Sequence, residues 1–264
     1  MIAICTIRPD PHYRREAFCS GLSKAGFTLS DRGDPRGPTD MLVIWNRYGA
    51  QEARADQWEK DGGTVLVAEN GYIGKDDEGR QLYALAVHGH NGSGWWPVGS
   101  EDRWATLGVE VLPFVRRNEG YSLICGQRGI GSRTMASPPD WHILVSRKLQ
   151  KQGIATKIRP HPGNRPAATK LEDDLNMAER CVVWSSSSGV KALTMGIPVQ
   201  YDAPHWICAG AATKVGPTLA YPDDETRLKA LQRMAHAQWK VAELETGEPF
   251  TRILEGVKYG AAKW

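Results

Sequence analysis

The sequence predicts an α/β protein built on parallel sheets, on three observations. Short apolar runs that suit β-strands alternate with amphipathic stretches that suit helices, from the first residues onward. Glycine, proline and serine clusters separate these segments and mark the loops between them. The 264 residues, 41% of them hydrophobic and 24% charged, suffice for one large or two small domains. Strands and helices in this rhythm form parallel sheets with right-handed crossovers.

Expected strands and helices alternate in the first half of the chain. The strands are expected at 2–7, 41–45, 64–68 and 108–113, and the helices at 13–25 and 50–60. Gly26 ends the first helix and Gly62-Gly63 the second, as glycine often does. The stretch 83–104, which contains HGHNGSGWWPVGSEDRW, is expected to be a long irregular loop. Such a loop inside a compact domain usually carries function.

The second half continues the same alternation after a polar linker at 116–120. Strands are expected at 121–125 and 181–184, with a short strand before Arg159, and helices at 140–153, from 189 to Gly196, and at 224–246. The glycine-rich loop 126–133 lets backbone approach a phosphate, and Arg128 or Arg133 would add positive charge. The acidic run 172–174 lies at a helix start and is expected to be a solvated face that complements the helix dipole.

Two loops of the second half have the chemistry of an anion site. Arg159-Pro160-His161-Pro162-Gly163 places a guanidinium and an imidazole on a stiff turn after a strand. Ser185-Ser186-Ser187-Ser188-Gly189 follows an apolar strand and opens a helix, so its N–H groups and hydroxyls can bind an anion. The carboxyl ends of neighbouring parallel strands share one crevice. The two loops are therefore expected to converge on one phosphate or diphosphate, rather than to form a plain N-cap and a structural turn.

The motifs RPHPG and WSSSSGVKALTMGIPV resemble the nucleotide-sugar half of GT-B glycosyltransferases. They are similar to the His-Pro and serine motifs of the capsule-type transferases and to related bacteriophage proteins, over residues 157–206. The resemblance implies two Rossmann-like parallel-sheet domains that face each other across a cleft, with a terminal helix that crosses back to the first domain. The acceptor-side domain would be 1–118 with 240–264, and the nucleotide-sugar domain 119–239. The implied donor-binding residues are Arg128, Arg159, His161, Ser185, Ser186, Ser187, Ser188 and Gly189.

The catalytic residue that the resemblance implies is Glu69. The sequence AENGY looks like the Glu-Asp-Gly-Phe element of the capsule-type transferases, although position 70 is Asn where that family often has Asp. A single carboxylate suits an inverting displacement, in which Glu69 accepts the proton of the attacking hydroxyl. If the base always stood at the second position, this chain would lack it. The other account of Glu69 is a surface carboxylate at a strand end.

The acceptor is left open between three alternatives. Residues expected to contact it are Asn70, Tyr72, His88, His90, Trp95 and Trp96. The slightly favoured acceptor is a hydroxymethylated pyrimidine in DNA, as in phage DNA glycosyltransferases, because a net charge of +3 and a loop rich in Trp and His suit a flipped base. The second alternative is a surface polysaccharide, and the third is a nucleotide-binding protein without transfer activity. UDP-hexose is the expected donor because it is common for this fold, whereas CMP-linked acids serve the capsule relatives.

The expected co-substrate follows from the resemblance, and the expected location from the sequence itself. The resemblance implies a nucleotide sugar as co-substrate, with no tightly bound cofactor. The His88/His90 pair could hold a divalent metal, but without a placed carboxylate it does not indicate one, and no metal site is assigned. No apolar run reaches the roughly 20 residues of a membrane span. Five scattered cysteines without CxxC spacing and a first segment unlike a signal peptide predict a cytoplasmic protein, in the host cytoplasm if it is viral.

Overall fold

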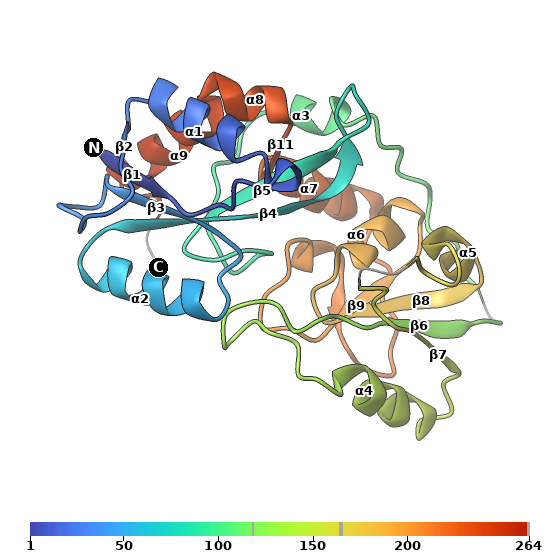
Figure 1. Cartoon of the computed structure of the whole chain (residues 1–264). Helices are drawn as coiled ribbons and strands as arrows, with labels where there is room; N and C mark the ends of the chain where they lie inside the picture. Colours follow the sequence, from blue (N-terminus) through green and yellow to red (C-terminus); the bar gives the residue numbers. More distant parts are fainter. Residues whose placement is uncertain (118, 164–165, 263–264) are drawn as a thin grey trace. The chain divides into compact units, whose positions relative to one another are not determined.

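A computed structural model describes residues 1–117, 119–163 and 166–262 (Figure 1). The chain divides into two compact units. Unit 1 comprises Met1–Leu107, Gly131–Arg133 and Ala235–Trp264, and unit 2 comprises Gly108–Ile130 and Thr134–Met234. The C-terminal segment therefore returns to the unit that contains the N-terminus. The expected domain boundary at Asn118 lies outside the described residues.

Unit 1 is built on a six-stranded sheet within the described residues, in the order β11-β5-β4-β3-β1-β2. Its strands are β1 (Ile2–Cys5), β2 (Thr28–Leu29), β3 (Met41–Trp45), β4 (Thr64–Lys75), β5 (Gln81–Val87) and β11 (Gln238–Trp239). The first four are parallel, and β5 and β11 add antiparallel at one side. The sheet thus has a parallel core with an antiparallel extension.

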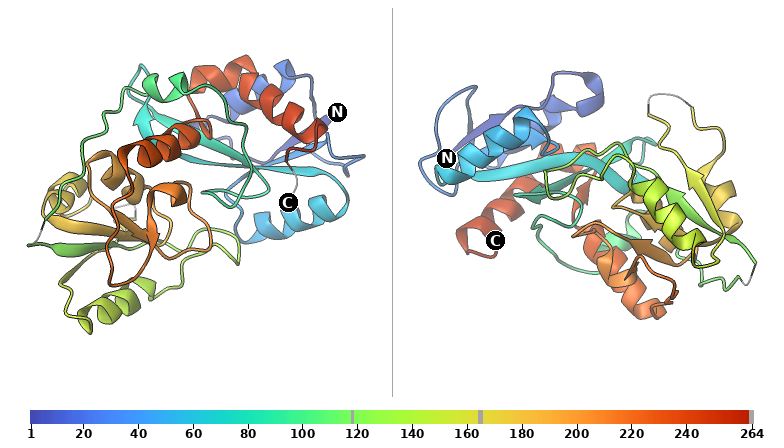
Figure 2. Two further views of the ribbon diagram at one scale, coloured as in Figure 1. Left: turned by 180° about the vertical axis from the view of Figure 1, so that it is seen from behind. Right: turned by 90° about the horizontal axis from the view of Figure 1, so that it is seen from below.

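Helices cover both faces of this sheet. They are α1 (Arg15–Lys24), α2 (Ala50–Lys60), α3 (Asp102–Ala105), α8 (Val241–Thr246) and α9 (Glu248–Lys258), after a short 3-10 turn η1 (Pro11–Tyr13). Met41 and Val43 point into the core shared with α1, α8 and α9, whereas Leu42 and Ile44 point to the core under α2. Figures 1 and 2 show α2 on the face opposite to α1, α8 and α9. Burial on both faces explains why β3 is an uninterrupted apolar run.

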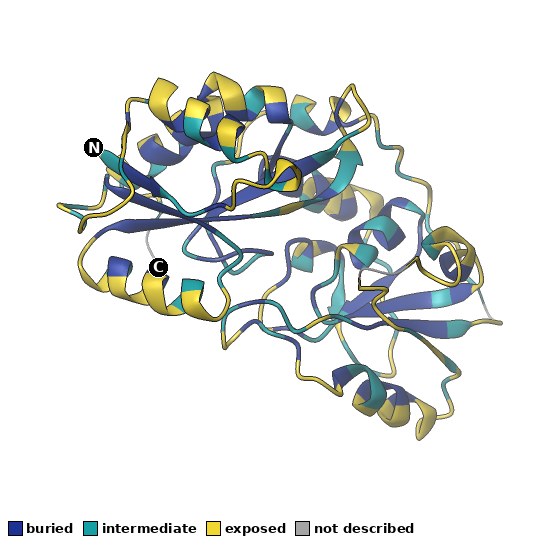
Figure 3. Ribbon diagram, viewed as in Figure 1, coloured by how far each residue is buried: buried dark blue, intermediate teal, exposed yellow. Residues whose placement is uncertain are grey.

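Unit 2 is built on a five-stranded sheet, all of it parallel within the described residues, in the order β10-β9-β8-β6-β7. Its strands are β6 (Tyr121–Cys125), β7 (Thr156–Arg159), β8 (Ala178–Val183), β9 (Val199–Tyr201) and β10 (Thr213–Lys214). Its helices are α4 (Trp141–Gln150), α5 (Leu171–Asn176), α6 (Ser187–Thr194), α7 (Asp224–Ala235) and the 3-10 turn η2 (Ala209–Ala211). In each unit the central strands are buried and the outer faces of the helices are exposed (Figure 3). Over the described residues, no helix combines the length and apolar character of a membrane span.

Two expectations for the first half of the chain need correction. The stretch expected to be an irregular loop is irregular only over 88–101, because it begins inside β5, which pairs with β4 as a hairpin, and ends inside α3. The run 82–87 is buried on both faces, which hides the alternation that marks an exposed strand. Conversely, the strand expected at 108–113 does not form. Instead, the N–H of Leu112 donates to Thr194 O at 2.8 Å. The next residue, Pro113, has no N–H with which to pair in a sheet.

The long helix expected at 224–246 is also wrong, because the chain breaks it into α7, β11 and α8. Gln238 pairs with Ala84 and Trp239 with Tyr83 in antiparallel register. Glu243 accepts the N–H of Lys240 at 2.7 Å and so begins a new helix. Pairing with the exposed edge of β5 outweighs the helix propensity of these residues.

The packing of α1 against the C-terminal helices α8 and α9 requires a glycine at position 21. A Cβ added at Gly21 of α1 would lie 1.9 Å from the carbonyl oxygen of Leu244 and 2.5 Å from the ring of Phe250. The backbones of α1 and α8 approach so closely that no side chain fits between them. Phe18, which is fully buried, packs against Phe250 beside this contact.

We predict that Gly21→Ala lowers the free energy of unfolding by about 1–3 kcal/mol, because overpacking outweighs the gain of about 1 kcal/mol in helix propensity. Chemical denaturation of the whole chain measures this difference. Ser20→Ala is the matched control, since Ser20 is exposed on the same helix and should leave stability unchanged or slightly raised. A Gly21→Ala protein as stable as the wild type would contradict the close packing of α1 on α8.

Candidate functional site

The carboxyl edge of the unit 2 sheet has the topology of a ligand site. The chain runs from β6 to its neighbour β7 and then crosses to β8 on the other side of β6. The strand order therefore reverses between β6 and β8. Ligands of open α/β sheets bind at such a switch point, outside the carboxyl ends of the strands. The loops after β6, β7 and β8 are the ones in which the sequence predicts donor-binding residues.

A reciprocal pair of hydrogen bonds spans the switch point. The N–H of Ser185, after β8, donates to Oε1 of Gln127, after β6, at 2.6 Å. Nε2 of Gln127 donates back to Oγ of Ser185 at 3.3 Å. The sequence did not single out Gln127, because one amide in a glycine-rich loop has no distinctive spacing. Ser185 is therefore a buried anchor of the serine loop, and the exposed part of the loop begins after it.

The serine loop caps helix α6. Oγ of Ser186 accepts the N–H of Ser188 at 3.1 Å and donates to Oγ of Ser188 at 3.0 Å, so Ser186 is the N-cap. Ser187 is exposed and is the first helical residue, whose N–H has no acceptor within the helix. The positive end of the helix dipole lies there as well. Gly189 is buried instead, and an added Cβ would lie 2.7 Å from the ring of Trp206, so its smallness serves packing.

The His-Pro loop lies beside the glycine-rich loop. The N–H of Gly126 donates to Arg159 O at 2.9 Å. Nδ1 of His161 accepts the N–H of Gly163 at 2.8 Å, which assigns the proton of the neutral ring to Nε2. Partial burial, and then the charge of nearby Arg128, lower the pKa of His161 below its ordinary value. His161 is therefore neutral at pH 7 and offers an N–H donor next to an exposed guanidinium.

Arg159 has a different environment from the one expected. Its guanidinium donates to Oγ1 and O of Thr169, each at 2.7 Å, and pairs with Asp174. Asp174 also accepts from Nζ of Lys157 at 2.7 Å and is buried. The expectation that the whole run 172–174 is a solvated face is thus wrong for Asp174, which points inward from the first turn of α5. Donor binding by Arg159 stays a prediction, and its visible role is to join β7 to α5.

In unit 1, Glu69 lies in β4 at the centre of a small polar cluster. Its Oε1 accepts the hydroxyl of Tyr72 and the N–H of Asn91, the latter at 3.1 Å. The same N–H is 3.1 Å from Oη of Tyr72. Oε2 makes no hydrogen bond or ion pair with any residue that the structure describes. Glu69 is partly exposed, so one carboxylate oxygen is fixed while the other is open.

The other residues expected to contact an acceptor are dispersed. Asn70 is exposed, and its Oδ1 accepts from Gln81 at 2.8 Å, on the face of β4 opposite to Glu69. Nδ1 of His88 lies 2.6 Å from Glu59, which also pairs with Arg47.

The remaining expected residues, His90, Trp95 and Trp96, are folded into unit 1. His90 and Trp96 are buried, and Trp95 packs so tightly that a Cβ on Gly256 would lie 1.9 Å from its ring. These burials leave little aromatic surface for stacking, and the acceptor assignments stay predictions.

Arg133, the second arginine of the glycine-rich loop, contacts helix α2 of unit 1. Gly131–Arg133 is grouped with unit 1, where Arg133 N–H donates to Glu52 at 2.8 Å and the guanidinium lies 3.3 Å from Asp56. Arg128 is thus the arginine of this loop that remains beside His161.

Among residues 1–117, 119–163 and 166–262, no three His, Cys, Asp or Glu side chains gather as metal ligands would.

We predict that Asp174→Asn lowers the free energy of unfolding by about 1.5–3 kcal/mol at pH 7, because it removes a charge that accepts three side-chain hydrogen bonds. Burial raises the pKa of Asp174, but bonds from Lys157, Thr169 and Arg159 outweigh it and hold the pKa below its ordinary value. A depressed pKa stabilises the fold above the ordinary pKa, and the benefit fades as pH falls through the depressed one.

In urea denaturation, the difference in the free energy of unfolding between wild type and Asp174→Asn should therefore be largest at pH 6–7 and shrink below about pH 4. Asp173→Asn, on the exposed side of the same turn, is the matched control. A difference that stays constant down to pH 2 would contradict the ion-pair assignment.

Comparisons with known proteins agree with this architecture. No model of a known protein family matches the chain, and no curated protein matches its sequence. In fold the chain is similar to KpsC of Thermosulfurimonas dismutans in a structure described as a β-Kdo 2,7 transferase, with a TM-score of 0.53 and 13% identity over 94% of this chain and 98% of that one. It is also similar to KpsC of the same organism described as a β-Kdo 2,4 transferase, with a TM-score of 0.53 and 15% identity over 89% of each chain. At these identities the likeness concerns the fold, and the two α/β units, one on a parallel sheet and one on a sheet with a parallel core, agree with the GT-B fold.

Proposed function

We propose that this protein is a glycosyltransferase that moves a sugar from a nucleotide-linked donor to a hydroxyl group. The observation that carries the proposal is the carboxyl edge of unit 2, where Gln127 and Ser185 join two loops at the switch point of the sheet. Around them lie the exposed start of α6 and the pair of Arg128 and His161. The likeness in fold to two Kdo transferases supports the same reaction class.

The donor phosphate would be held by neutral and cationic hydrogen-bond donors together. Ser187 N–H and the dipole of α6 favour an anion at the helix start. Nε2–H of His161 and the guanidinium of Arg128 would stabilise the negative charge that develops as the sugar leaves the phosphate. Because the similar structures are Kdo transferases, a CMP-linked sugar acid is the first donor to test, and UDP-hexose is the second.

Glu69 is the proposed general base of an inverting displacement. Its Oε2 would accept the proton of the acceptor hydroxyl as that oxygen bonds to the anomeric carbon and the bond from this carbon to the phosphate oxygen breaks. Tyr72 and Asn91 hold Oε1, so the carboxylate keeps one orientation. Because the carboxylate is already held in one orientation, it loses less conformational entropy when it reaches the reactive geometry.

A sugar hydroxyl of a glycan is the acceptor that we propose. The alternative of a hydroxymethylated pyrimidine in DNA was suggested by an aromatic loop, but Trp96 is buried and Trp95 packs against Gly256. A flipped base needs exposed rings on which to stack. The similar structures are named as transferases of Kdo, a sugar acid, which adds weight to a glycan.

The test offers the purified protein CMP-Kdo or UDP-hexoses, with either a free oligosaccharide or duplex DNA containing hydroxymethylcytosine, and detects products by mass spectrometry. An oligosaccharide heavier by one sugar residue is the expected result. A heavier nucleoside after digestion of the DNA would move the acceptor to DNA. Binding of a nucleotide sugar with neither transfer nor hydrolysis would identify a binding protein, and no binding at all would overturn the proposal.

We predict that Glu69→Gln lowers kcat by at least about 10²-fold while the affinity for the nucleotide sugar stays unchanged, because only the proton acceptor is lost. Single-turnover assays and isothermal titration measure the two quantities. Glu78→Gln is the matched control: it makes the same substitution at an exposed carboxylate in the turn between β4 and β5 and should leave kcat within about threefold. Full turnover by Glu69→Gln would remove Glu69 from the mechanism.

A further inference from the structure

The contact between Tyr72 and Glu69 requires an irregular strand. Residues three apart in a regular strand point to opposite faces of the sheet. In β4, however, Asn70 faces Tyr83 and Lys75 faces Gln81, so five residue steps of β4 oppose two of β5. This bulge, 70–75, lets Tyr72 turn back to the face of Glu69.

Gly71 permits the close passage of the bulge over β5. A Cβ added there would lie 2.8 Å from Cβ of Leu82 and 2.9 Å from its carbonyl oxygen. The strand can therefore depart from regular pairing while its backbone stays packed. A bulge, however, leaves backbone N–H and C=O groups without partners in the ladder. Buried groups of this kind must find another partner, since leaving one unpaired costs stability.

Gln238 provides these partners from β11, 165 residues further along the chain. Its Oε1 accepts the N–H of Tyr72 at 2.8 Å and the N–H of Ile73 at 3.3 Å, and its Nε2 donates to Ile73 O at 2.7 Å. Gln238 is 0% exposed, so no water competes for these bonds. One carboxamide thus satisfies three backbone groups of the bulge.

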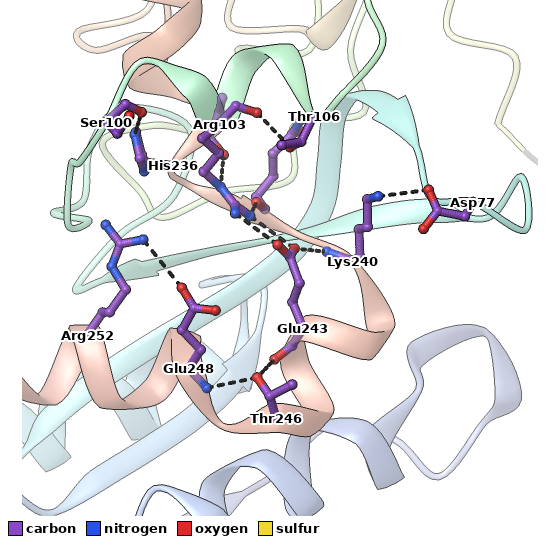
Figure 4. A network of polar contacts seen from close by, with 12 residues as sticks. Asp77, Ser100, Arg103, Thr106, His236, Lys240, Glu243, Thr246, Glu248 and Arg252 are labelled. Carbon is purple, nitrogen blue, oxygen red and sulfur yellow. Dashed lines mark hydrogen bonds and ion pairs between the residues drawn. The ribbon is translucent and has the colours of Figure 1, made fainter.

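Gln238 is itself held in place by Arg103, which points toward Glu243 in Figure 4. The guanidinium of Arg103 donates to Gln238 O at 2.5 Å and to Ala235 O at 2.9 Å, and it stacks 4.0 Å from the ring centre of Trp239. Its other end forms an ion pair of 2.9 Å with Glu243 on α8. The backbone of β11 is therefore fixed from both sides, by β5 and by Arg103.

We propose that Gln238 is a positioning residue for the carboxylate of Glu69. By holding the bulge, it keeps the hydroxyl of Tyr72 on Oε1 of Glu69 and so determines where Oε2 points. The catalytic consequence rests on the proposed function, in which Glu69 is the base. The structural consequence does not, because the bond from Asn91 N–H to Glu69 should weaken whenever the bulge is released.

The test measures amide hydrogen exchange of the whole protein carrying Gln238→Leu. Exchange of the Tyr72 and Ile73 amides should accelerate because their acceptor is gone. Exchange of the Asn91 amide, which does not touch Gln238, should accelerate by about tenfold as well, as expected for one lost hydrogen bond. Lys240→Ala is the matched control, because it removes the 2.9 Å ion pair with Asp77 beside β11 but leaves Gln238 intact (Figure 4). Asn91 exchange equal to wild type in Gln238→Leu would overturn the proposal.

Gln238→Glu keeps the test decisive if the leucine variant does not fold. A protonated carboxyl offers the same acceptor and donor as the carboxamide, whereas an ionised one cannot donate to Ile73 O. Burial raises the pKa of the introduced carboxyl. Protection of the Asn91 amide, corrected for intrinsic exchange, should therefore match wild type at low pH and be lost as pH rises through that raised pKa. Protection that does not depend on pH relative to wild type would contradict the positioning role.

Activity then separates this inference from the proposed function. Gln238→Leu should lower kcat by about tenfold and leave the KM for the nucleotide sugar unchanged, since it affects the orientation of the base and not the donor. If Glu69→Gln retains full turnover, the assignment of the base fails, and the exchange of Asn91 still decides whether Gln238 orders the cluster. If Glu69→Gln is inactive and Gln238→Leu turns over as wild type, the positioning proposal fails alone.

Discussion

The antiparallel pairing of β11 with β5 is the constraint on which unit 1 depends. It covers the edge of a sheet whose N-terminal strands are all parallel, and it brings residues 235–262 back to the start of the chain. Helices α8 and α9 follow β11 directly in the chain, and both contact α1 at Gly21. The same two-residue strand delivers the carboxamide of Gln238 to the bulge of β4. The strand β11 thus both covers the edge of the unit 1 sheet and orders the cluster around Glu69.

Unit 2 reaches its polar edge by another route. Backbone pairing in its parallel sheet brings the ends of β6, β7 and β8 together, and the loops then bond to one another. The charges divide into two groups. Arg159 and Lys157 neutralise the buried carboxylate of Asp174 and so serve the scaffold, because an unpaired buried charge would be costly. Arg128 stays exposed near His161, so its charge remains available to a bound anion.

The sequence predicted those features that depend on local chemistry. β3 is an apolar run buried on both faces, and the serine loop is an N-cap followed by a helix, so each was visible in its own residues. The sequence did not predict features that depend on partners distant in the chain. A helix was expected where β11 forms, because nothing local announces an edge strand that only β5 can pair. Gln127 was missed for the same reason, since its importance comes from Ser185, 58 residues away. Asn91 acts through its backbone N–H, which every residue except proline carries.

The position of Asn70 bears on which residue of the AENGY segment could act as a base. Strand alternation turns its side chain away from Glu69, toward Gln81, and leaves it exposed. A carboxylate at position 70 would therefore meet neither the hydroxyl of Tyr72 nor the N–H of Asn91. Only the bulge after it returns a side chain, that of Tyr72, to the face of Glu69. The fixed hydrogen bonds of Oε1 and the open side of Oε2 thus favour Glu69 over any side chain at position 70 as the proton acceptor.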